Sequence, residues 1–252
     1  MNIAICFLTT NKNHFNLKLL KDQIKLSSLH NIDVYEYIDN DSEYIEYINI
    51  TNDHIIYFNY DFLVKKTKYN RADINYIHPA LGKKVGLEFL TFIDMYINHK
   101  NEYDFYMFYE DDVSYFGSKN LFDIIDFNCD VLFQDRRFNA KEDGWYWTSC
   151  EPYNLNDINI IYHGLLNIYG LTGNIIDEII NYYLQGNYCH HEGLISSYVL
   201  NNEKYKVNYI DDHIKSYFDF WDSVEVNGYY DLIHPIKTEE KYNLIYNEHH
   251  KI

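Results

Sequence analysis

Three consecutive carboxylates, Glu110, Asp111 and Asp112, end an aromatic and apolar run that reads YDFYMFYEDDV from Tyr103 to Val113. Adjacent carboxylates repel one another, so a fold that gathers them at the end of a buried strand has to neutralise them. A hard divalent cation does this well, because Mg²⁺ and Mn²⁺ favour carboxylate oxygens as ligands. A solvated loop is the alternative interpretation, and the apolar residues on both sides of the triplet argue against it. The triplet therefore predicts a site for a divalent cation.

A second short string, LIHPIK, offers groups that complement the triplet. His234 is a possible metal ligand, and Lys237 supplies an ammonium group for an anion. Pro235 lies between them and stiffens the turn. For His234 taken alone, a packed or surface histidine is the alternative interpretation. Together with the acidic triplet, the string predicts that a metal ion and a lysine share a diphosphate.

The elements that must position these groups alternate along the chain. Strands are predicted at Ile3–Leu8, Asp33–Tyr37, His54–Phe58, Asp130–Gln134, Ile160–Ile168 and Tyr205–Ile210, and helices at Phe15–Ser28, Gly82–His99, Asn174–Leu184 and Glu192–Leu200. Such alternation is typical of a parallel sheet with crossover helices, and ligands of these sheets lie at the carboxyl ends of the strands. The acidic triplet ends a strand and is therefore expected on that edge.

Three other segments do not follow this alternation. Phe138–Tyr153 has neither helical nor strand periodicity, and its glycine, proline and two tryptophans predict an excursion or lid. Gly170–Gly173 is expected to form a turn. The tail from Asp211 onward is expected to be mostly loop around the HPIK string.

The composition limits the classes of function that remain. The chain has 252 residues, with 38 acidic residues against 21 Lys and Arg and a formal net charge of −17. This charge repels nucleic-acid phosphates and argues against nucleic-acid binding. The four cysteines, Cys6, Cys129, Cys150 and Cys189, lack the paired spacing of a zinc or redox motif. Without a recognisable signal peptide or an apolar run of about 20 residues, we expect a soluble, cytoplasmic protein with no transmembrane segment.

Four sequence features together resemble the GT-A glycosyltransferases, which use nucleotide sugars. They are the AICFLTTN opening, the helix that leads into FYMFYEDDV, the unit GLISSYVLNNEKYKVNYID, and the late HPIK. The resemblance implies one α/β domain over residues 1–252, with a central, mostly parallel sheet flanked by helices. It implies a nucleotide-sugar-binding half at residues 1–113. The acceptor half and a C-terminal loop for metal and diphosphate would occupy residues 114–252.

The resemblance also implies roles for the acidic triplet and the HPIK string. A DxD-type motif in these enzymes ends a central strand and binds Mn²⁺ or Mg²⁺, and a late histidine often completes the metal site. Asp112 and His234 would hold the ion here, and Lys237 would contact the diphosphate. Glu110 and Asp111 would contact the ribose, the sugar or the metal ion with its water. Because Glu110 stands where the strict motif has Asp, Asp112 is the better candidate ligand.

Further candidates for the nucleotide sugar follow from the same resemblance. Thr9, Thr10 and Asn11 occupy the segment that contacts the nucleotide in the resembling fold, although such residues also cap the helix that follows. Lys83 and Lys84 at a helix start could reach the base or the diphosphate, and a solvated helix face is the alternative.

Candidates for acceptor binding and for the chemical step lie in the second half of the chain. Glu192 would deprotonate an acceptor hydroxyl, with His191 in reserve, although an N-terminal helix carboxylate is common for dipole reasons alone. Trp145 and Trp147 could stack on sugar faces, and hydrophobic anchoring of the loop is the alternative.

The sequence and the resemblance therefore predict a metal-dependent glycosyltransferase that moves a sugar from a nucleotide sugar, expected to be UDP-linked, to a glycan or another hydroxyl acceptor. An inverting reaction follows only if Glu192 acts as the base. One alternative is a nucleotidyltransferase of similar fold, which usually carries a glycine-rich basic loop after its first strand. The corresponding TTNKNH segment of this chain has no glycine. The other alternative is a non-catalytic carbohydrate-binding protein.

Overall fold

The computed structural model describes residues 1–9, 14–28, 31–39, 46–50, 53–58, 63, 87–144, 154–187, 189–218 and 229–249. Its strands are β1 (Asn2–Thr9), β2 (Asn31–Asp39), β3 (Glu46–Ile50), β4 (Asp53–Phe58), β5 (Phe105–Glu110), β6 (Ser114–Tyr115), β7 (Val131–Phe133), β8 (Phe138–Asn139), β9 (Tyr162–His163), β10 (Ile168–Leu171), β11 (Val207–Tyr209), β12 (Ser216–Phe218) and β13 (Leu232–His234). Its helices are α1 (Phe15–Leu26), α3 (Leu87–Asn98), α4 (Leu121–Ile124), α5 (Ala140–Asp143), α7 (Gly173–Leu184), α8 (His191–Leu200), the 3₁₀ turn η1 (Ile210–Asp212) and α9 (Glu239–His249).

Within the described residues, eight strands form one sheet in the order β11-β7-β10-β5-β1-β2-β4-β3. Strands β1, β2, β4 and β5 are parallel to one another, and β7 is parallel to β11. Only β10 and β3 run against their neighbours in this sheet. The sheet takes strands from both halves of the chain. The α/β class and the mostly parallel central sheet predicted from the sequence are confirmed.

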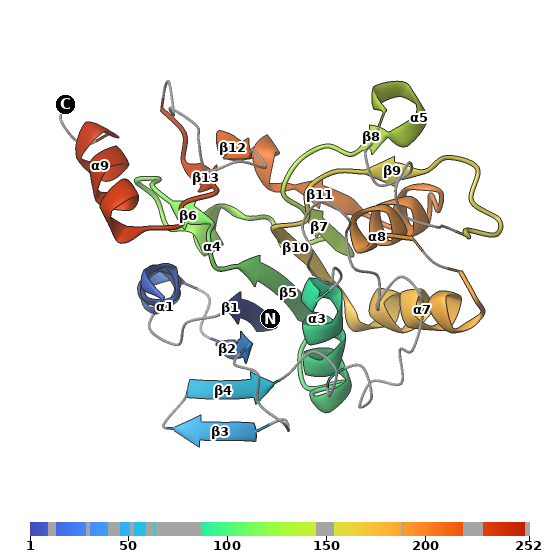
Figure 1. Ribbon diagram of the computed structural model, residues 1–252, viewed down its shortest axis with the longest axis horizontal. Helices are drawn as coiled ribbons and strands as arrows, with labels where there is room; N and C mark the ends of the chain where they lie inside the picture. The colour runs from blue at the N-terminus through green and yellow to red at the C-terminus, as the bar shows by residue number, and fades with distance from the viewer. Residues whose placement is uncertain are drawn as a thin grey trace.

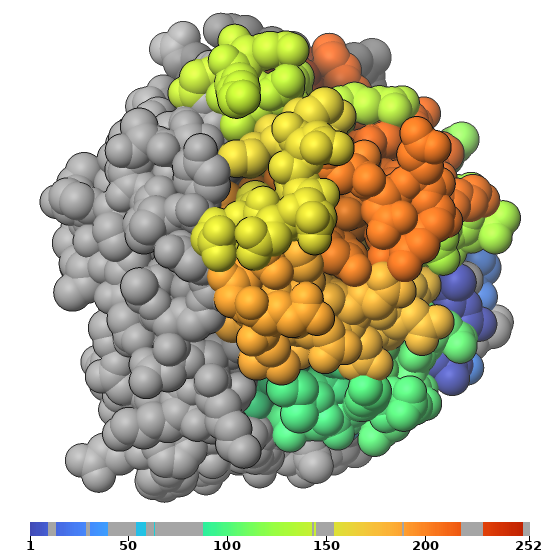
Figure 2. Space-filling model, turned by 90° about the vertical axis from the view of Figure 1, so that its right-hand side faces the viewer, coloured from blue at the N-terminus to red at the C-terminus, as the bar shows by residue number. Residues whose placement is uncertain are grey.

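Helices cover both faces of this sheet (Figure 1). Successive residues of β1 are apolar and buried, as expected for a strand with a helix layer on each side. The face with Cys6 packs against α3, α7 and α8, and the face with Phe7 packs against α1 and α4. Figure 2 shows the outer surface of the first layer, where α3, α7 and α8 lie next to one another. None of the described helices is long and apolar enough to cross a membrane.

A second, smaller sheet holds the C-terminal part of the described chain against the first. It has the order β12-β13-β6, and β13 pairs with β6, the short strand that follows the acidic triplet. Helix α9 packs on this sheet through Ile245 and Tyr242, which meet Phe116 and the side chain of Phe15 at the start of α1. This third cluster of apolar side chains joins α9, α1 and β13.

The structure corrects three expectations about the elements. The predicted strand Ile160–Ile168 is broken, because only Tyr162–His163 pairs with β8 and the strand of the central sheet begins at Ile168. The expected turn Gly170–Gly173 is also wrong, since Gly170 lies within β10 and Gly173 begins α7. The tail is not mostly loop, because β12, β13 and α9 follow Asp211.

Candidate metal centre

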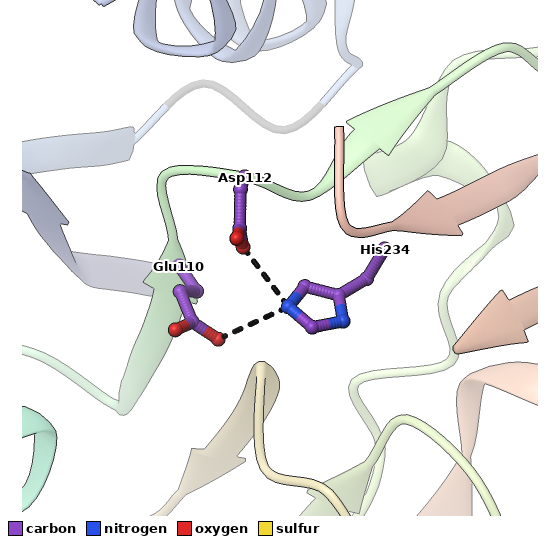
Figure 3. A group of neighbouring side chains, drawn as sticks. All are labelled: Glu110, Asp112 and His234. Atoms are coloured by element: carbon purple, nitrogen blue, oxygen red, sulfur yellow. Dashed lines mark ion pairs between the residues drawn. The ribbon is translucent and has the colours of Figure 1, made fainter. Parts of the chain in front are cut away.

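The acidic triplet lies at the carboxyl end of β5, beside the end of β1. The register pairs Leu8 with Glu110, so the ends of the two strands meet at the same edge of the sheet. Glu110 and Asp112 both point at the imidazole of His234 (Figure 3). The Nε2 atom of His234 lies 3.0 Å from Asp112 Oδ1 and 3.7 Å from Glu110 Oε2. The predicted grouping of these three residues is therefore present.

The pairing of β13 with β6 brings His234 to the triplet from far along the chain. Ser114 pairs with Ile233, so β13 ends on His234 directly beside the loop that holds Asp112. The amide of Ile236 then donates a 2.6 Å hydrogen bond to the carbonyl oxygen of Asp112. The backbone on both sides of His234 is thus held by the segment that carries the carboxylates.

The donor atoms of Glu110, Asp112 and His234 fit a divalent cation. One ligand atom from each residue lies within 4.8 Å of the other two. The Oδ1 atom of Asp112 is buried and has no hydrogen-bond partner among the described residues. Burial raises the pKa of Glu110 to about 8, and the charge of Asp112 adds to this while His234 opposes it. Mn²⁺ readily binds two carboxylates and one imidazole. Mg²⁺ also binds the carboxylates, but it has a weaker preference for the imidazole nitrogen.

An amide side chain, Asn167, completes the wall of this cluster. It lies directly before β10, and its Nδ2 donates to Glu110 Oε2 and lies 3.1 Å from His234 Nε2. The Nε2 atom of His234 therefore has three polar neighbours, the amide of Asn167 and the carboxylates of Glu110 and Asp112. Gln134 supports the arrangement, because its Nε2 lies 3.5 Å from Asn167 Oδ1 and its Oε1 accepts from the amide of Ile168.

The middle residue of the triplet, Asp111, faces a different set of groups. Its Oδ2 accepts a 2.7 Å hydrogen bond from Thr9 and lies 3.8 Å from His14 Nε2. The Nδ1 atom of His14 accepts from the amide of Asn16, which leaves the ring proton on Nε2, facing Asp111. Burial raises the pKa of Asp111, while Thr9 and His14 counteract the effect. Asp111 thus forms a polar patch with Thr9 and His14 beside the metal-ligand cluster.

Lys237 brings a cation to the same edge. Its side chain is 54% exposed, and Nζ lies 3.9 Å from Asp112 Oδ2. A long, solvated lysine can move toward an anion bound at the cluster. The HPIK string therefore contributes both an imidazole and an ammonium group next to the acidic triplet.

The candidate base and its reserve lie at the start of α8, and both side chains are buried. Glu192 lies 3.6 Å from the Nδ1 atom of His190, and its charge acts on the buried guanidinium of Arg137. Burial lowers the pKa of His191, and Glu88 opposes this shift. Glu88, at the start of α3, also raises the pKa of Glu110, so it lies within electrostatic reach of both groups.

Six of the predicted site residues lie outside the residues that the structure describes. They are Thr10, Asn11, Lys83, Lys84, Trp145 and Trp147. The predicted lid is described only in part, since β8 and α5 occupy its first residues.

Three residues that contact the cluster or its neighbours, His14, Asn16 and Asn167, were not predicted from the sequence. His14 and Asn16 lie in and before the first turn of α1, where polar residues are common caps. Asn167 lies inside the predicted strand Ile160–Ile168. Its contact with the triplet depends on β10 running antiparallel to β5. The available signal in the sequence was the concentration of His and Asn in residues 11–16.

No protein-family model and no curated protein matches the chain by sequence. Among solved structures, it is similar to the galactosyltransferase LgtC in complex with donor and acceptor sugar analogues, with 12% identity and a TM-score of 0.43 over 82% of this chain and 72% of that one. An active-site mutant of LgtC has 9% identity and a TM-score of 0.45 over 92% and 86%. Mouse xyloside xylosyltransferase 1 in its apo form has 10% identity and a TM-score of 0.41 over 93% and 97%. These likenesses concern the course of the chain and carry no information about activity.

Proposed function

We propose that this protein is a metal-dependent glycosyltransferase that moves a sugar from a nucleotide sugar, of the UDP-linked class, to a hydroxyl group of a glycan or another acceptor. The observation that carries the proposal is the cluster of Glu110, Asp112 and His234 at the carboxyl edge of a mostly parallel sheet, with Lys237 beside it. Ligands of such sheets bind at this edge.

The residues of the cluster divide the work of holding the donor. Asp112, His234 and Glu110 would hold Mn²⁺ or Mg²⁺, which as a Lewis acid stabilises the negative charge of a departing diphosphate. Lys237 would place its ammonium group on the same phosphates. Thr9 and Asp111 would bind the ribose hydroxyls, because a carboxylate accepts hydrogen bonds from a diol and a threonine hydroxyl can donate or accept.

The chemical step needs a group that takes a proton from the acceptor hydroxyl. Glu192 is the proposed base and His191 the reserve. Both side chains are buried at the start of α8, and Glu88 acts electrostatically on His191 and on Glu110. Trp145 and Trp147 remain proposed contacts of the acceptor. The proposed division has donor binding in residues 1–113 and acceptor binding in residues 114–252, with the C-terminal segment returning to the donor.

Calorimetric titration of UDP-sugars with and without Mn²⁺ tests the donor and the metal together. In Asp112→Asn and His234→Ala, the loss of one ligand should weaken Mn²⁺-dependent binding by at least about tenfold, the lower end of what even outer-shell changes at metal sites cost. Asp22→Asn and His213→Ala are matched controls, because both residues are exposed and neither belongs to the cluster.

Unchanged affinity in both cluster variants would contradict the metal site. Product analysis separates the remaining alternatives. Release of UDP with a glycosylated acceptor supports transfer, formation of a nucleotide sugar from a nucleoside triphosphate would indicate a nucleotidyltransferase, and binding of sugar without turnover would indicate a non-catalytic protein.

A further inference from the structure

Asn16, in the first turn of α1, is a buried polar residue whose side-chain hydrogen bonds go to the segments around the candidate metal centre. It is 2% exposed. Its Nδ2 donates to the carbonyl oxygen of Asp111 at 2.7 Å and to that of Ile236 at 3.3 Å. Its Oδ1 accepts a 2.6 Å hydrogen bond from the hydroxyl of Ser114.

The partners fix the orientation of this amide group. The carbonyl oxygens of Asp111 and Ile236 can only accept, so the NH₂ group has to face them. The hydroxyl of Ser114 then donates to the oxygen. Both protons of the NH₂ group are used, and replacement by a side chain with fewer donors leaves at least one carbonyl without this partner.

The two carbonyls belong to the two segments that carry the metal ligands. Asp111 lies between Glu110 and Asp112, and Ile236 lies two residues after His234. One side chain on α1 therefore bridges the carboxylate loop and the histidine segment. The bond from the amide of Ile236 to the carbonyl of Asp112 is the direct link between the same two segments.

We propose that Asn16 is a positioning residue of the metal centre: its amide group sets the spacing between the carboxylates of Glu110 and Asp112 and the imidazole of His234. The inference rests on the proposed function, because it assigns Asn16 to the metal and diphosphate site named there. Asn16 does not touch the ion or the donor. It acts through the backbone of the residues beside the ligands, and partners of this outer kind typically contribute about 10–100-fold to metal affinity.

Gln23 provides a comparison on the same helix. Its side chain accepts from the amide of Leu121, and its carbonyl oxygen accepts from Asn120, so it also ties α1 to the chain that follows β5. These contacts lie at the start of α4 and not at the triplet. If both residues had a purely structural role, substitutions at Asn16 and Gln23 would change the metal affinity to a similar extent. If Asn16 positions the metal ligands, only substitutions at Asn16 would lower that affinity.

The experiment measures Mn²⁺ affinity, Mn²⁺-dependent UDP affinity and the melting temperature of the wild type, Asn16→Ala, Asn16→Ser and Gln23→Ala. We expect Asn16→Ala to lose about 10–100-fold in Mn²⁺ affinity. Asn16→Ser should lose less, because its single hydroxyl proton can serve only one of the two carbonyls. Gln23→Ala should keep wild-type affinity even where it melts earlier. Saturating Mn²⁺ should restore UDP binding to Asn16→Ala but not to His234→Ala.

The outcomes separate this inference from the proposed function. Wild-type protein that binds Mn²⁺ and UDP, together with Asn16 variants of equal affinity, would overturn the inference and leave the function standing. An equal loss of affinity in Gln23→Ala would also overturn it, since affinity would then follow stability. Wild-type protein that binds neither Mn²⁺ nor UDP would overturn both. If Asn16→Ala does not fold, the comparison of Asn16→Ser with Gln23→Ala decides between the same outcomes.

Discussion

At the scale of residues, the candidate metal centre places two carboxylates that repel one another against a single imidazole. Glu110 and Asp112 converge on one nitrogen of His234, and burial together with the charge of Asp112 raises the pKa of Glu110. An amide from Asn167 softens the repulsion by donating to Glu110. The negative charge gathered at this site therefore favours a bound cation.

The two carboxylates of the cluster could be singled out from the sequence, because three adjacent carboxylates after a buried run are chemically costly. Their supporting residues could not. Asn16 and Asn167 are ordinary polar residues in the sequence, and only the folded chain shows that each contacts two segments far apart in sequence. A contact between segments that are far apart along the chain produces no local pattern in the sequence.

The proposed base gives a prediction at this scale. Glu192→Gln should keep UDP-sugar binding but lose about 10²–10⁴-fold in the rate of transfer, because the amide cannot accept the acceptor's proton. The measurement is steady-state turnover at saturating Mn²⁺ with the donor affinity determined separately. Glu203→Gln is the matched control, since Glu203 is exposed after the end of α8.

Near-normal turnover of Glu192→Gln would remove Glu192 from the mechanism, as would a product that retains the donor's anomeric configuration. A loss of stability without a loss of rate would instead assign Glu192 to its electrostatic interaction with Arg137.

At the scale of elements, the antiparallel strand β10 decides how the site is built. Because β10 runs against β5, its beginning and not its end lies at the carboxyl edge, and Asn167 reaches Glu110 from there. The strands β1, β2 and β4 and the helices α1, α7 and α8 could be predicted from apolar periodicity. Strand β10 could not, because glycines at both ends of the stretch from Gly170 to Gly173 are typical of a turn.

Packing explains why a glycine lies inside that strand. A Cβ atom at Gly170 would overlap the ring of Phe105 on the neighbouring strand β5 and crowd Met107. Phe105 is fully buried and packs against Phe127, so the ring cannot move away without disturbing its neighbours. The glycine is required by a neighbouring strand and not by a turn.

Gly170→Ala should accordingly lower the free energy of unfolding by about 1–3 kcal/mol, the usual cost of overpacking a core. Urea denaturation followed by circular dichroism measures it. Gly173→Ala is the control, because a Cβ there lies at ordinary van der Waals distance, 3.4 Å from the nearest atom of Tyr96. Equal stability of the two variants would contradict the packing explanation.

Helix α9 was missed for a different reason. Among its described residues, Tyr242 and Ile245 pack on Phe116 and the smaller sheet, while Leu244 and Tyr246 are exposed. Because apolar residues lie both on the packed side and on the exposed side, the segment lacks the apolar period that would distinguish a helix from a loop.

At the scale of the whole molecule, a chain with a net charge of −17 is proposed to bind a phosphate-bearing donor. A uniform field of this sign would repel such a ligand, so the local groups have to reverse it. Lys237 and the proposed cation at the triplet would do so at one edge of the sheet, where segments from the beginning, middle and end of the described chain meet. The composition predicted that a phosphate-binding site would need local positive charge, but it could not show at which edge of the sheet that charge lies.

Ligand binding at that edge should therefore affect the whole segment of residues 232–249. Hydrogen exchange of residues 232–249 should slow when Mn²⁺ and UDP are added, because His234 and Lys237 tie this segment to the ligand. Helix α7 is the internal control, since it packs on the sheet face and contributes no residue to the cluster. Equal changes in both regions, or no change in either, would contradict the proposed ligand set.

The pairing of β13 with β6 also means that the residues of the cluster come together only after a long stretch of chain has been synthesised. Glu110 and Asp112 are synthesised first, and His234 follows after a delay on the order of ten seconds at about 5–20 residues per second. During that interval the nascent chain has its carboxylates and the central strand but no imidazole, and β6 has no partner strand. Every strand of the larger sheet precedes β13 in the sequence, so that sheet can pair before His234 is made, and a cation could be held by all three residues only afterwards.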